Sequence, residues 1–220
     1  MKIKEITPID CKDWLLNKHY ARRMPPINKA FGLIVDDSIV GVCTFAIPAS
    51  RFEFSLQPYE LNRLVVNEGL EKNTLSQFVV MCLKNFNDAA IIVSYADENY
   101  GHHGYIYQAT NWIYTGRSSA EKKMFVDGKE LHRRTLYDKY GTSSIPKLEE
   151  LGLVITFEKQ LGKHRYFQFC GNKKEKRKLK DEVIQKYGMF NYPKGDNTRY
   201  DSGRDIVKKI KHETIQSYLF

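Results

Sequence analysis

The sequence contains no apolar run long enough to cross a membrane, because polar residues interrupt every hydrophobic stretch of the 220-residue chain. The first residues, MKIKEITPIDCKDW, also lack the apolar core of a secretory signal peptide. We therefore expect an intracellular protein of the cytoplasm that makes no membrane contacts. Hydrophobic residues still make up 42% of the chain, which is enough to build a substantial core.

Cysteines are few and scattered. The four of them, Cys11, Cys43, Cys82 and Cys170, lie far apart, and none belongs to a C-x-x-C pair. This spacing excludes the disulfide framework of a small secreted protein and the ligand pattern of a zinc finger. We expect four free thiols buried in the core.

Acidic residues do not balance the basic ones, and the excess lies at one end of the chain. The net charge is +9, from 35 Lys and Arg against 26 Asp and Glu. Residues 1–158 hold 19 of each sign, whereas residues 159–220 hold 16 basic and 7 acidic residues. This division predicts a neutral core in residues 1–158 and a basic C-terminal extension in residues 159–220 that packs on the core and contacts DNA. A basic tail that is solvated and binds nothing is the alternative.

Two segments supply the expected contacts to nucleic acid. The run GNKKEKRKLKDEV opens a predicted helix, and the strand-like HRYFQF mixes basic with aromatic residues. Such a strand is typical of a nucleic-acid surface, although strand aromatics also pack on sheets. The predicted DNA-binding residues are Lys173, Lys174, Lys176, Arg177, Lys178, Lys180 and Arg165.

The order of predicted elements indicates a mixed α/β sheet flanked by helices. Residues 59–66, a helix from residue 74 and a strand at residues 89–94 form a strand–helix–strand unit, which implies two parallel strands. Residues 30–48 predict a hairpin that turns at Asp36 and Asp37. The other predicted strands are residues 2–6, 112–115, 123–126, 131–137, 153–157 and 164–169, the last two paired with each other; further helices are predicted near residues 10–19, at 104–112 and after 173.

Residues 94–116, SYADENYGHHGYIYQATNWIYTG, concentrate titratable and aromatic side chains around glycines. They lie where a predicted strand passes into a short helix, which is where open α/β sheets commonly bind ligands. In that helix the spacing predicts an inward face formed by Tyr105, Ala109 and Trp112. We therefore look for a binding site in this stretch.

Two further candidates are single residues or pairs. His19 and Tyr20 lie at a helix end that leads into Pro25 and Pro26, so His19 is either functional or a cation favoured by the helix dipole. Arg63 interrupts an otherwise apolar strand, and it is either a paired structural charge or a ligand-binding cation.

The start of the long helix is a third candidate. Asn73 and Thr74 supply its N-cap, and the hydroxyls of Thr74 and Ser76 beside free backbone N–H groups could hold a phosphate. Ordinary capping is the alternative.

The order of elements resembles the GNAT acyltransferase fold, with YIYQATNWIYTG as its short helix and following strand. In many GNAT enzymes a tyrosine of that helix acts as general acid on the departing coenzyme A thiolate, and Tyr107 resembles it; Asn111 stands where the family has glycine. More specifically, HY…RMPP, ELNRL, NTLS, YADENYGHHGYIYQATNW and KHRYF together resemble the phage Mom family of GNAT-related enzymes, which modify the exocyclic amine of adenine in DNA. These segments span roughly residues 19–169.

The resemblance implies a phage DNA modification enzyme that uses acetyl-CoA or another acyl-CoA. It would add an acetamido- or methylcarbamoyl-type group to adenine in double-stranded DNA and so protect phage DNA from host restriction. An iron ion is associated with the family. The residues implied are Tyr107, Asp97, His19 and Tyr20 at the chemistry, with Arg63 and Ser76 beside them. Together with the start of the long helix, the predicted cofactor-binding residues are Arg63, Asn73, Thr74 and Ser76.

The sequence departs from the GNAT pattern in one loop. Ordinary GNAT enzymes have an Arg/Gln-x-x-Gly-x-Gly loop before the long helix, whereas this chain has NEGLEKNTLS with Gly69 alone. We therefore do not expect the coenzyme A pyrophosphate to be held in the usual way.

The chemistry of adenine sets demands that these residues can meet. The adenine amine is a weak nucleophile, so a base such as Asp97 or His19 is needed beside it. A phenol such as that of Tyr107, with an ordinary pKa of about 10, suits an acid better than a base. A stacked base must be flipped out of the duplex, and aromatic residues could then stack on it: Tyr20, Tyr100, Tyr105 or Trp112.

Metal binding and function class stay open at this point. His19, Asp97, His102 and His103 could converge on a ferrous iron, or the adjacent histidines could be exposed hydrogen bonders. A GNAT-like enzyme acting on RNA or on a protein amine and a basic DNA-binding protein without catalysis are the competing functions. A homodimer would suit symmetric DNA sites.

Overall fold

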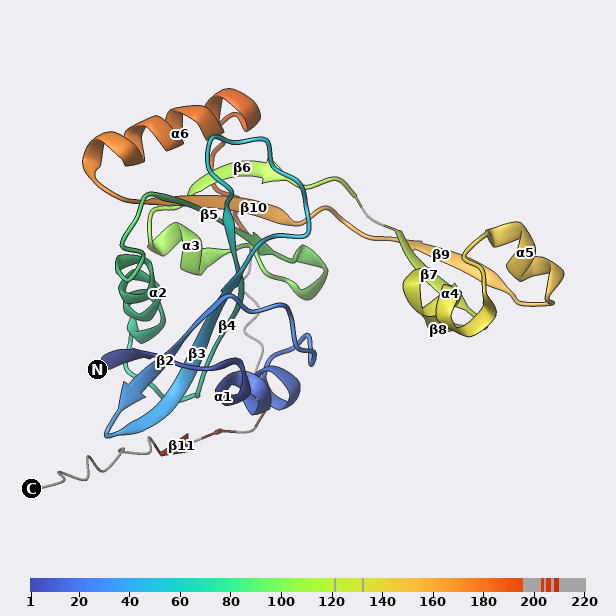
Figure 1. Ribbon diagram of the computed structural model, residues 1–220, viewed down its shortest axis with the longest axis horizontal. Helices are drawn as coiled ribbons and strands as arrows, with labels where there is room; N and C mark the ends of the chain where they lie inside the picture. Colours follow the sequence, from blue (N-terminus) through green and yellow to red (C-terminus); the bar gives the residue numbers. More distant parts are fainter. Residues whose placement is uncertain (121, 132, 196–202, 204, 207, 210–220) are drawn as a thin grey trace, which may run out of the picture.

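The computed structural model describes residues 1–120, 122–131, 133–195, 203, 205–206 and 208–209 (Figure 1). Its larger sheet confirms the predicted mixed α/β class, because β4 and β5 run parallel while the other neighbouring strands run antiparallel. In spatial order its strands are β1 (Lys2–Glu5), β2 (Lys29–Val35), β3 (Ser38–Ala46), β4 (Tyr59–Val66), β5 (Ala90–Ala96), β10 (His164–Cys170) and β6 (Ile113–Arg117), with β11 (Lys208–Lys209) beside β3.

The predicted hairpin and strand–helix–strand unit are both present. β2 and β3 turn at Asp36 and Asp37, which both have positive φ, as a tight hairpin turn requires. β4 passes through α2 (Thr74–Lys84) into β5. The parallel pairing joins Tyr59 and Glu60 to Ile92 and Val93 and extends no further. Beyond these residues the two strands separate.

Helices cover both faces of the sheet, and the alternation along β5 and β10 decides which side chains each face receives. Ile92 and Tyr166 pack towards α2 and α3 (Tyr105–Ala109). Ile91 and Phe167 pack on the opposite face, against Leu179 and Val183 of α6 (Lys173–Tyr187) and its neighbours. Figure 1 shows α6 across the sheet from α2 and α3.

A third helical segment closes the other end of the sheet. α1 (Pro8–Asp13) runs into the π-helical turn η1 (Trp14–Lys18). Trp14 and Leu15 are fully buried against Val42 and neighbouring apolar residues of β2 and β3. The turn ends at His19, as the sequence predicts.

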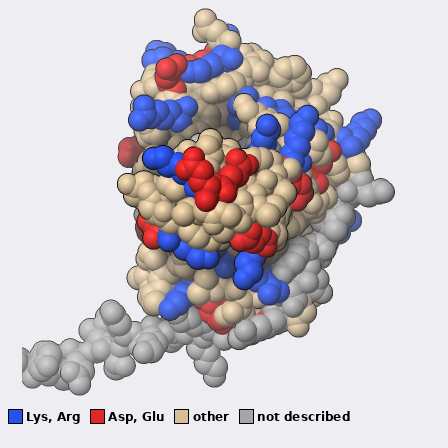
Figure 2. Space-filling model, turned by 90° about the vertical axis from the view of Figure 1, so that its right-hand side faces the viewer, with Lys and Arg blue, Asp and Glu red and all other residues tan. Residues whose placement is uncertain are grey.

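A small module extends from the main sheet between β6 and β10 (Figure 1). It has three strands, β7 (Lys122–Val126), β8 (Lys129–Glu130) and β9 (Ile155–Lys159), and two helices, α4 (Arg133–Tyr140) and α5 (Ile145–Glu150). Its own core contains Met124, Val126, Leu136 and Leu148. Figure 2, which faces this side, shows basic and acidic side chains intermixed, with a group of acidic ones near the centre.

The module is joined to the sheet through one narrow neck. The Ser118 amide donates to the Lys163 carbonyl at 2.8 Å, and the Lys163 amide donates to Ser118 Oγ at 2.9 Å. The two backbone segments of the neck pass so closely that a Cβ on Gly162 would collide with the Ser118 carbonyl oxygen. Glycine is therefore required at this position.

Two predictions about this region are wrong. Residues 131–137 do not form a strand, because Leu136 and Tyr140 lie four residues apart and pack together into the module core from α4. Residues 153–157 and 164–169 do not pair with each other. β9 pairs with β7, whereas both faces of β10 are buried and it lies between β5 and β6.

The predicted boundary between residues 158 and 159 does not separate β10 from the sheet. β10 occupies an interior position of the main sheet, and α6 packs on it. Most of the predicted extension beyond residue 195 lies outside the described residues.

The cysteines behave as predicted, since Cys11, Cys43, Cys82 and Cys170 are all free and buried. Among the described helices, none combines the length and apolar character that a membrane crossing requires.

Gly104 provides a test of the packing beneath α3. It has φ of 77°, and an added Cβ would overlap the Tyr166 ring. We predict that Gly104→Ala lowers the free energy of unfolding in urea by about 2–4 kcal/mol, from backbone strain and overpacking together.

Gly69→Ala is the matched control, because Gly69 has φ of 70° but no atom within 4 Å of the added Cβ. It should cost only the backbone strain, about 1 kcal/mol. Equal losses for the two variants would contradict the tight contact between Gly104 and Tyr166.

Candidate functional site

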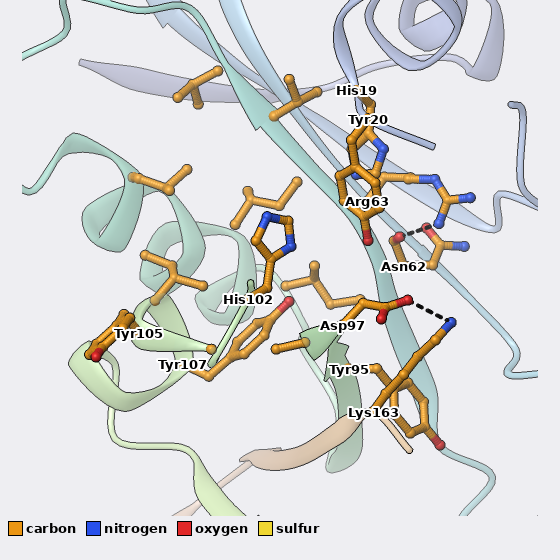
Figure 3. A pocket seen from close by; sticks show the side chains of 18 of the residues that line it. His19, Tyr20, Asn62, Arg63, Tyr95, Asp97, His102, Tyr105, Tyr107 and Lys163 are labelled. Atoms are coloured by element: carbon orange, nitrogen blue, oxygen red, sulfur yellow. Dashed lines mark hydrogen bonds and ion pairs between the residues drawn. The ribbon is translucent and has the colours of Figure 1, made fainter. Parts of the chain in front are cut away.

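A cavity of about 320 Å³ opens between the separating ends of β4 and β5, within the size range of small-molecule sites. Its walls come from the end of η1, from β4, from the start of α3 and from the turn that follows β5. Figure 3 shows these side chains converging: His19, Tyr20, Asn62, Arg63, Tyr95, Asp97, His102, Tyr105, Tyr107 and Lys163.

The cavity brings together most of the residues predicted for the chemistry. His19, Tyr20, Arg63, Asp97 and Tyr107 all line it, although they come from four separate segments. Asn73, Thr74 and Ser76 do not line it, but Leu75 of the same helical turn does.

Tyr107 lines the cavity, and the buried Ser94 holds its hydroxyl from behind. The Tyr107 Oη lies 2.7 Å from Ser94 Oγ, which also lies 2.7 Å from the Leu61 carbonyl oxygen. A hydroxyl has one proton and a carbonyl can only accept, so Ser94 donates to Leu61 and Tyr107 donates to Ser94. Burial raises the pKa of Tyr107 and keeps the phenol protonated. Its proton becomes available to a ligand only when the bond to Ser94 opens.

The inward face of α3 differs from the predicted one. Tyr107 and Trp112 are buried, with ring centroids 4.9 Å apart, but Ala109 is exposed and Tyr105 is half-buried. α3 has only five residues, so Trp112 lies beyond its end and the inward direction is set by Tyr107. The predicted face was therefore wrong at Ala109.

His19 is a neutral hydrogen-bond donor in this cavity. Burial, and then the nearby Arg63 and His102, lower the pKa of His19 to about 3. The Ala21 amide donates to His19 Nδ1 at 3.1 Å, so the proton of the neutral ring resides on Nε2. Because His19 Nδ1 already accepts a hydrogen bond, Asp97 is the better placed of the two predicted bases to accept a proton.

Asp97 is held firmly at the end of β5. Its Oδ1 accepts bonds from the Asn99 amide at 3.1 Å and the Asn99 side chain at 2.8 Å. Its Oδ2 lies 3.5 Å from the Lys163 ammonium group and is directed to the cavity (Figure 3). The turn thus fixes one oxygen and presents the other.

Arg63 lines the cavity from β4, and its side chain extends past Tyr20 towards Asn62 (Figure 3). Nη1 donates to the Asn62 carbonyl at 2.6 Å, but among the described residues no carboxylate forms an ion pair with Arg63, and its buried Nε has no hydrogen-bond partner. A buried donor without a partner is costly and favours a ligand with an acceptor. This supports the ligand-binding role of Arg63 over that of a paired structural charge.

Aromatic rings gather at the cavity around Tyr20. The Tyr20 ring centroid lies 4.4 Å from His19, 4.8 Å from Tyr100 and 5.2 Å from His102. Burial, and then Asp97, raise the pKa of Tyr20. The group offers flat apolar faces on which a planar ligand could stack.

A model of the Mom protein family matches residues 1–194. The chain belongs to the Mom protein family. Methylcarbamoylase mom of Escherichia phage Mu is 25% identical over 199 residues, which is 80% of this chain and 77% of that protein. The resemblance of the sequence motifs to this family is thereby confirmed.

In this Mom family member Asn73 is the N-cap residue of α2, as predicted. Asn73 has φ of 68°, and its side chain makes no capping hydrogen bond within the described part of the chain. The Ser76 hydroxyl donates to the Asn73 carbonyl at 2.8 Å, and Thr74 is buried. The binding of a cofactor by Asn73, Thr74 and Ser76 stays a prediction.

The predicted DNA-binding residues fall into two groups. The six cations of α6 are exposed, on the face of the sheet opposite α2 and α3 (Figure 1), and they are Lys173, Lys174, Lys176, Arg177, Lys178 and Lys180. Arg165 is engaged within the fold. Its Nε donates to Thr115 Oγ1 at 3.0 Å, and its guanidinium lies 3.9 Å from the centroid of the Tyr187 ring.

Several polar residues of the cavity were missed from the sequence, and three of them have contacts that bear on the site. Asn62 accepts from Thr44 Oγ1 at 2.6 Å and donates to the Pro26 carbonyl at 2.9 Å, so it ties β4 to the segment after His19. Glu60 is a second carboxylate, whose pKa is raised by burial. Lys163 comes from the neck of the small module and pairs with Asp97. Glu60 and Asn62 flank Leu61 in the ELNRL segment, which was the available signal.

The pH dependence of folding should report the state of His19. With a folded pKa of about 3, the ring stays neutral in the folded protein while the unfolded chain takes up a proton below about pH 6.5. Its contribution to stability is therefore complete above pH 6.5 and declines as the pH falls towards 3. We predict that wild type loses stability relative to His19→Asn between pH 7 and pH 4, measured by urea unfolding.

Asparagine retains an acceptor in place of Nδ1 for the Ala21 amide but cannot be protonated. A difference between the two proteins that stays constant over this pH range would contradict a buried neutral His19.

Proposed function

We propose that this Mom family member modifies DNA by transferring a methylcarbamoyl-type acyl group from a coenzyme A thioester of that same group to the exocyclic amine of adenine, which releases the coenzyme A thiol. The observation that carries the proposal is the cavity, in which a carboxylate, a protonated phenol and a guanidinium lie beside a group of aromatic rings in mutual contact. The phage Mu relative is named a methylcarbamoylase, which supports the choice of transferred group.

The cavity supports action on a single flipped base. Its volume of about 320 Å³ can hold a base but not a duplex. Tyr20 and His102 line the cavity and offer rings against which a base could pack, which offsets part of the cost of leaving the helix. The target amine would then point inward, towards Asp97.

Asp97 is the proposed general base. As the amine nitrogen forms its bond to the acyl carbon, Oδ2 accepts the proton that the nitrogen gives up. Lys163, 3.5 Å away, forms an ion pair with that oxygen and holds it in place. Glu60 and Glu68 are the other carboxylates that line the cavity, and Glu60 serves as the comparison residue.

Arg63 and Tyr107 serve the acyl donor in this proposal. An acyl-CoA supplies, when bound, an activated carbonyl carbon attached to a thiolate leaving group. The unpartnered Nε of Arg63 can donate to a carbonyl or phosphate oxygen of the donor. The proton of Tyr107 can pass to the departing sulfur, with Ser94 holding the phenol in place beforehand.

The free edge of β4 offers a place for the donor itself. Beyond Glu60 this edge no longer pairs with β5, so its backbone groups can bind the amides of a pantetheine arm. This mode of binding needs no glycine-rich loop, which agrees with the single Gly69 before α2. The residues of the cavity therefore fit an acyl-CoA better than the start of α2 alone does.

Mass spectrometry of deoxynucleosides from cells that express the protein tests the proposal directly. Wild type should yield a modified deoxyadenosine, and Asp97→Asn and Tyr107→Phe should each reduce its amount by about 10²-fold or more. Asp88→Asn and Tyr137→Phe, at exposed positions, are matched controls that should leave it unchanged.

No modified deoxyadenosine from folded wild type would overturn the proposal, and modified RNA or protein amines in its place would assign the enzyme to another substrate. Loss of product in Glu60→Gln but not in Asp97→Asn would move the base to Glu60.

DNA binding should depend on the exposed cations of α6. Replacing Lys174, Lys176, Lys178 and Lys180 by Gln should weaken binding to duplex DNA and reduce the slope of log K against log salt by about one for each lost phosphate contact. Filter binding or fluorescence anisotropy between 50 and 200 mM salt, roughly the range over which counterion release is evident, measures this slope.

The matched control replaces four exposed lysines of the small module, Lys122, Lys129, Lys139 and Lys147, by Gln. An unchanged slope in the α6 variant would show that its lysines form a solvated face.

A further inference from the structure

The segment between β5 and α3, together with Lys163 and His164, forms one wall of the cavity and presents side chains on both sides of that wall. Three pairs of consecutive residues divide between them: Asp97 and Glu98, His102 and His103, and Lys163 and His164. The first member of each pair lines the cavity. The second members, Glu98, His103 and His164, meet behind it. This division separates His103 from His19, Asp97 and His102, with which the sequence had grouped it as a metal ligand.

The three residues behind the wall direct their ligand atoms at one point. One nitrogen from each histidine and one carboxylate oxygen all lie within 4.8 Å of one another, the only such set of three or more among the described residues. His164 is 2% exposed. Its Nε2 and the Nδ1 of His103 are buried and lack a hydrogen-bond partner in the described part of the chain. Two orphaned imidazole nitrogens in one place are expensive unless something binds them.

A direct hydrogen bond does not resolve this arrangement. His164 Nε2 lies 3.5 Å from Glu98 Oε2, which is longer than an N–H···O bond. Two atoms that bind one tetrahedral ion at about 2.1 Å each lie about 3.4 Å apart. The observed spacing therefore matches two ligands of a shared cation better than a donor and its acceptor.

The surroundings orient the histidines for this purpose. The Tyr114 hydroxyl lies 2.8 Å from His164 Nδ1, which fixes the ring and leaves Nε2 towards the cluster. Gly195 packs on the Nε2 side of His103, so its Nδ1 is the nitrogen that faces Glu98 and His164. Arg117 ion-pairs with Glu98 from the outer side, and its side chain is 45% exposed, so it can turn to solvent when a cation takes its place.

We propose that Glu98, His103 and His164 bind a divalent first-row transition metal, such as zinc or iron(II), in a site behind the cavity wall. Two imidazole nitrogens and one carboxylate oxygen suit these ions rather than magnesium or calcium. The ion would join the turn after β5 to the start of β10. It would thereby fix the two elements that present Asp97 and Lys163 to the cavity.

Metal uptake by the purified full chain tests the site without reference to activity. Protein stripped with a chelator is titrated with Zn²⁺, and with Co²⁺ as a spectroscopic probe, followed by metal analysis after desalting. Wild type should retain one equivalent of zinc, show visible cobalt absorption from nitrogen and oxygen ligands, and melt at a higher temperature with metal than without.

Three variants remove one ligand atom each while retaining nearby bonds. Glu98→Gln keeps an acceptor for Arg117, His164→Asn keeps a partner for Tyr114, and His103→Gln keeps polar contact on the Gly195 side. Each should bind zinc at least about 10-fold more weakly and lose the metal-dependent rise in melting temperature. Circular dichroism of the metal-free variants checks that each one folds.

His102→Gln and Asp97→Asn are the matched controls, because these neighbours face the cavity. Both should bind zinc as wild type does. The proposal is overturned if folded wild type retains no metal and leaves the cobalt spectrum as that of the free ion, or if His102→Gln loses as much affinity as His103→Gln.

Discussion

β4 and β5 stay paired at only two positions and then diverge, and the candidate site is built into that divergence. Where the two strands diverge, the backbone groups of their facing edges lose their partners in the sheet. Other hydrogen bonds must then fix the distance between the strands. Ser94 does this from β5, since its hydroxyl donates across the gap to the Leu61 carbonyl and accepts from Tyr107. One short side chain therefore joins both strands to α3. The depth of the cavity and the position of the phenol depend on the same two hydrogen bonds.

The charges of the site are controlled by burial as much as by their partners. His19 is neutral because desolvation lowers its pKa, and the Ala21 amide selects its tautomer. Asp97 has one oxygen held by Asn99 and the other beside Lys163. A neutral donor, His19, and an ion pair between Asp97 and Lys163 are thus held in one cavity. Such preorganisation is what acid–base chemistry on a weak nucleophile requires.

The sequence allowed the strands of the main sheet, the hairpin and the parallel unit to be predicted, because their apolar runs and turn residues are local signals. Asp97 could be placed at the site because it directly follows a buried strand, and the family motifs added His19 and Tyr107. Lys163 and His164 could not be placed, since their roles depend on β10 entering the sheet beside β5 after about seventy intervening residues. The division of His102 from His103 was also hidden, because the direction of a side chain in an irregular turn has no sequence period. The wrong prediction of a strand at residues 131–137 could have been avoided, because the four-residue spacing of Leu136 and Tyr140 is typical of a helix.

The neck at Ser118 and Lys163 has a mechanical consequence. The small module leaves and rejoins the sheet at one point, where two backbone chains touch over Gly162. The module can therefore move relative to the sheet only about this one connection, which contains Lys163, the residue that pairs with Asp97. A displacement of the distant helices α4 and α5 is transmitted to the sheet through this contact. A partner that binds the module would therefore be connected through the covalent chain to the Lys163–Asp97 ion pair of the cavity. Its connection to the helices that cover the sheet is less direct.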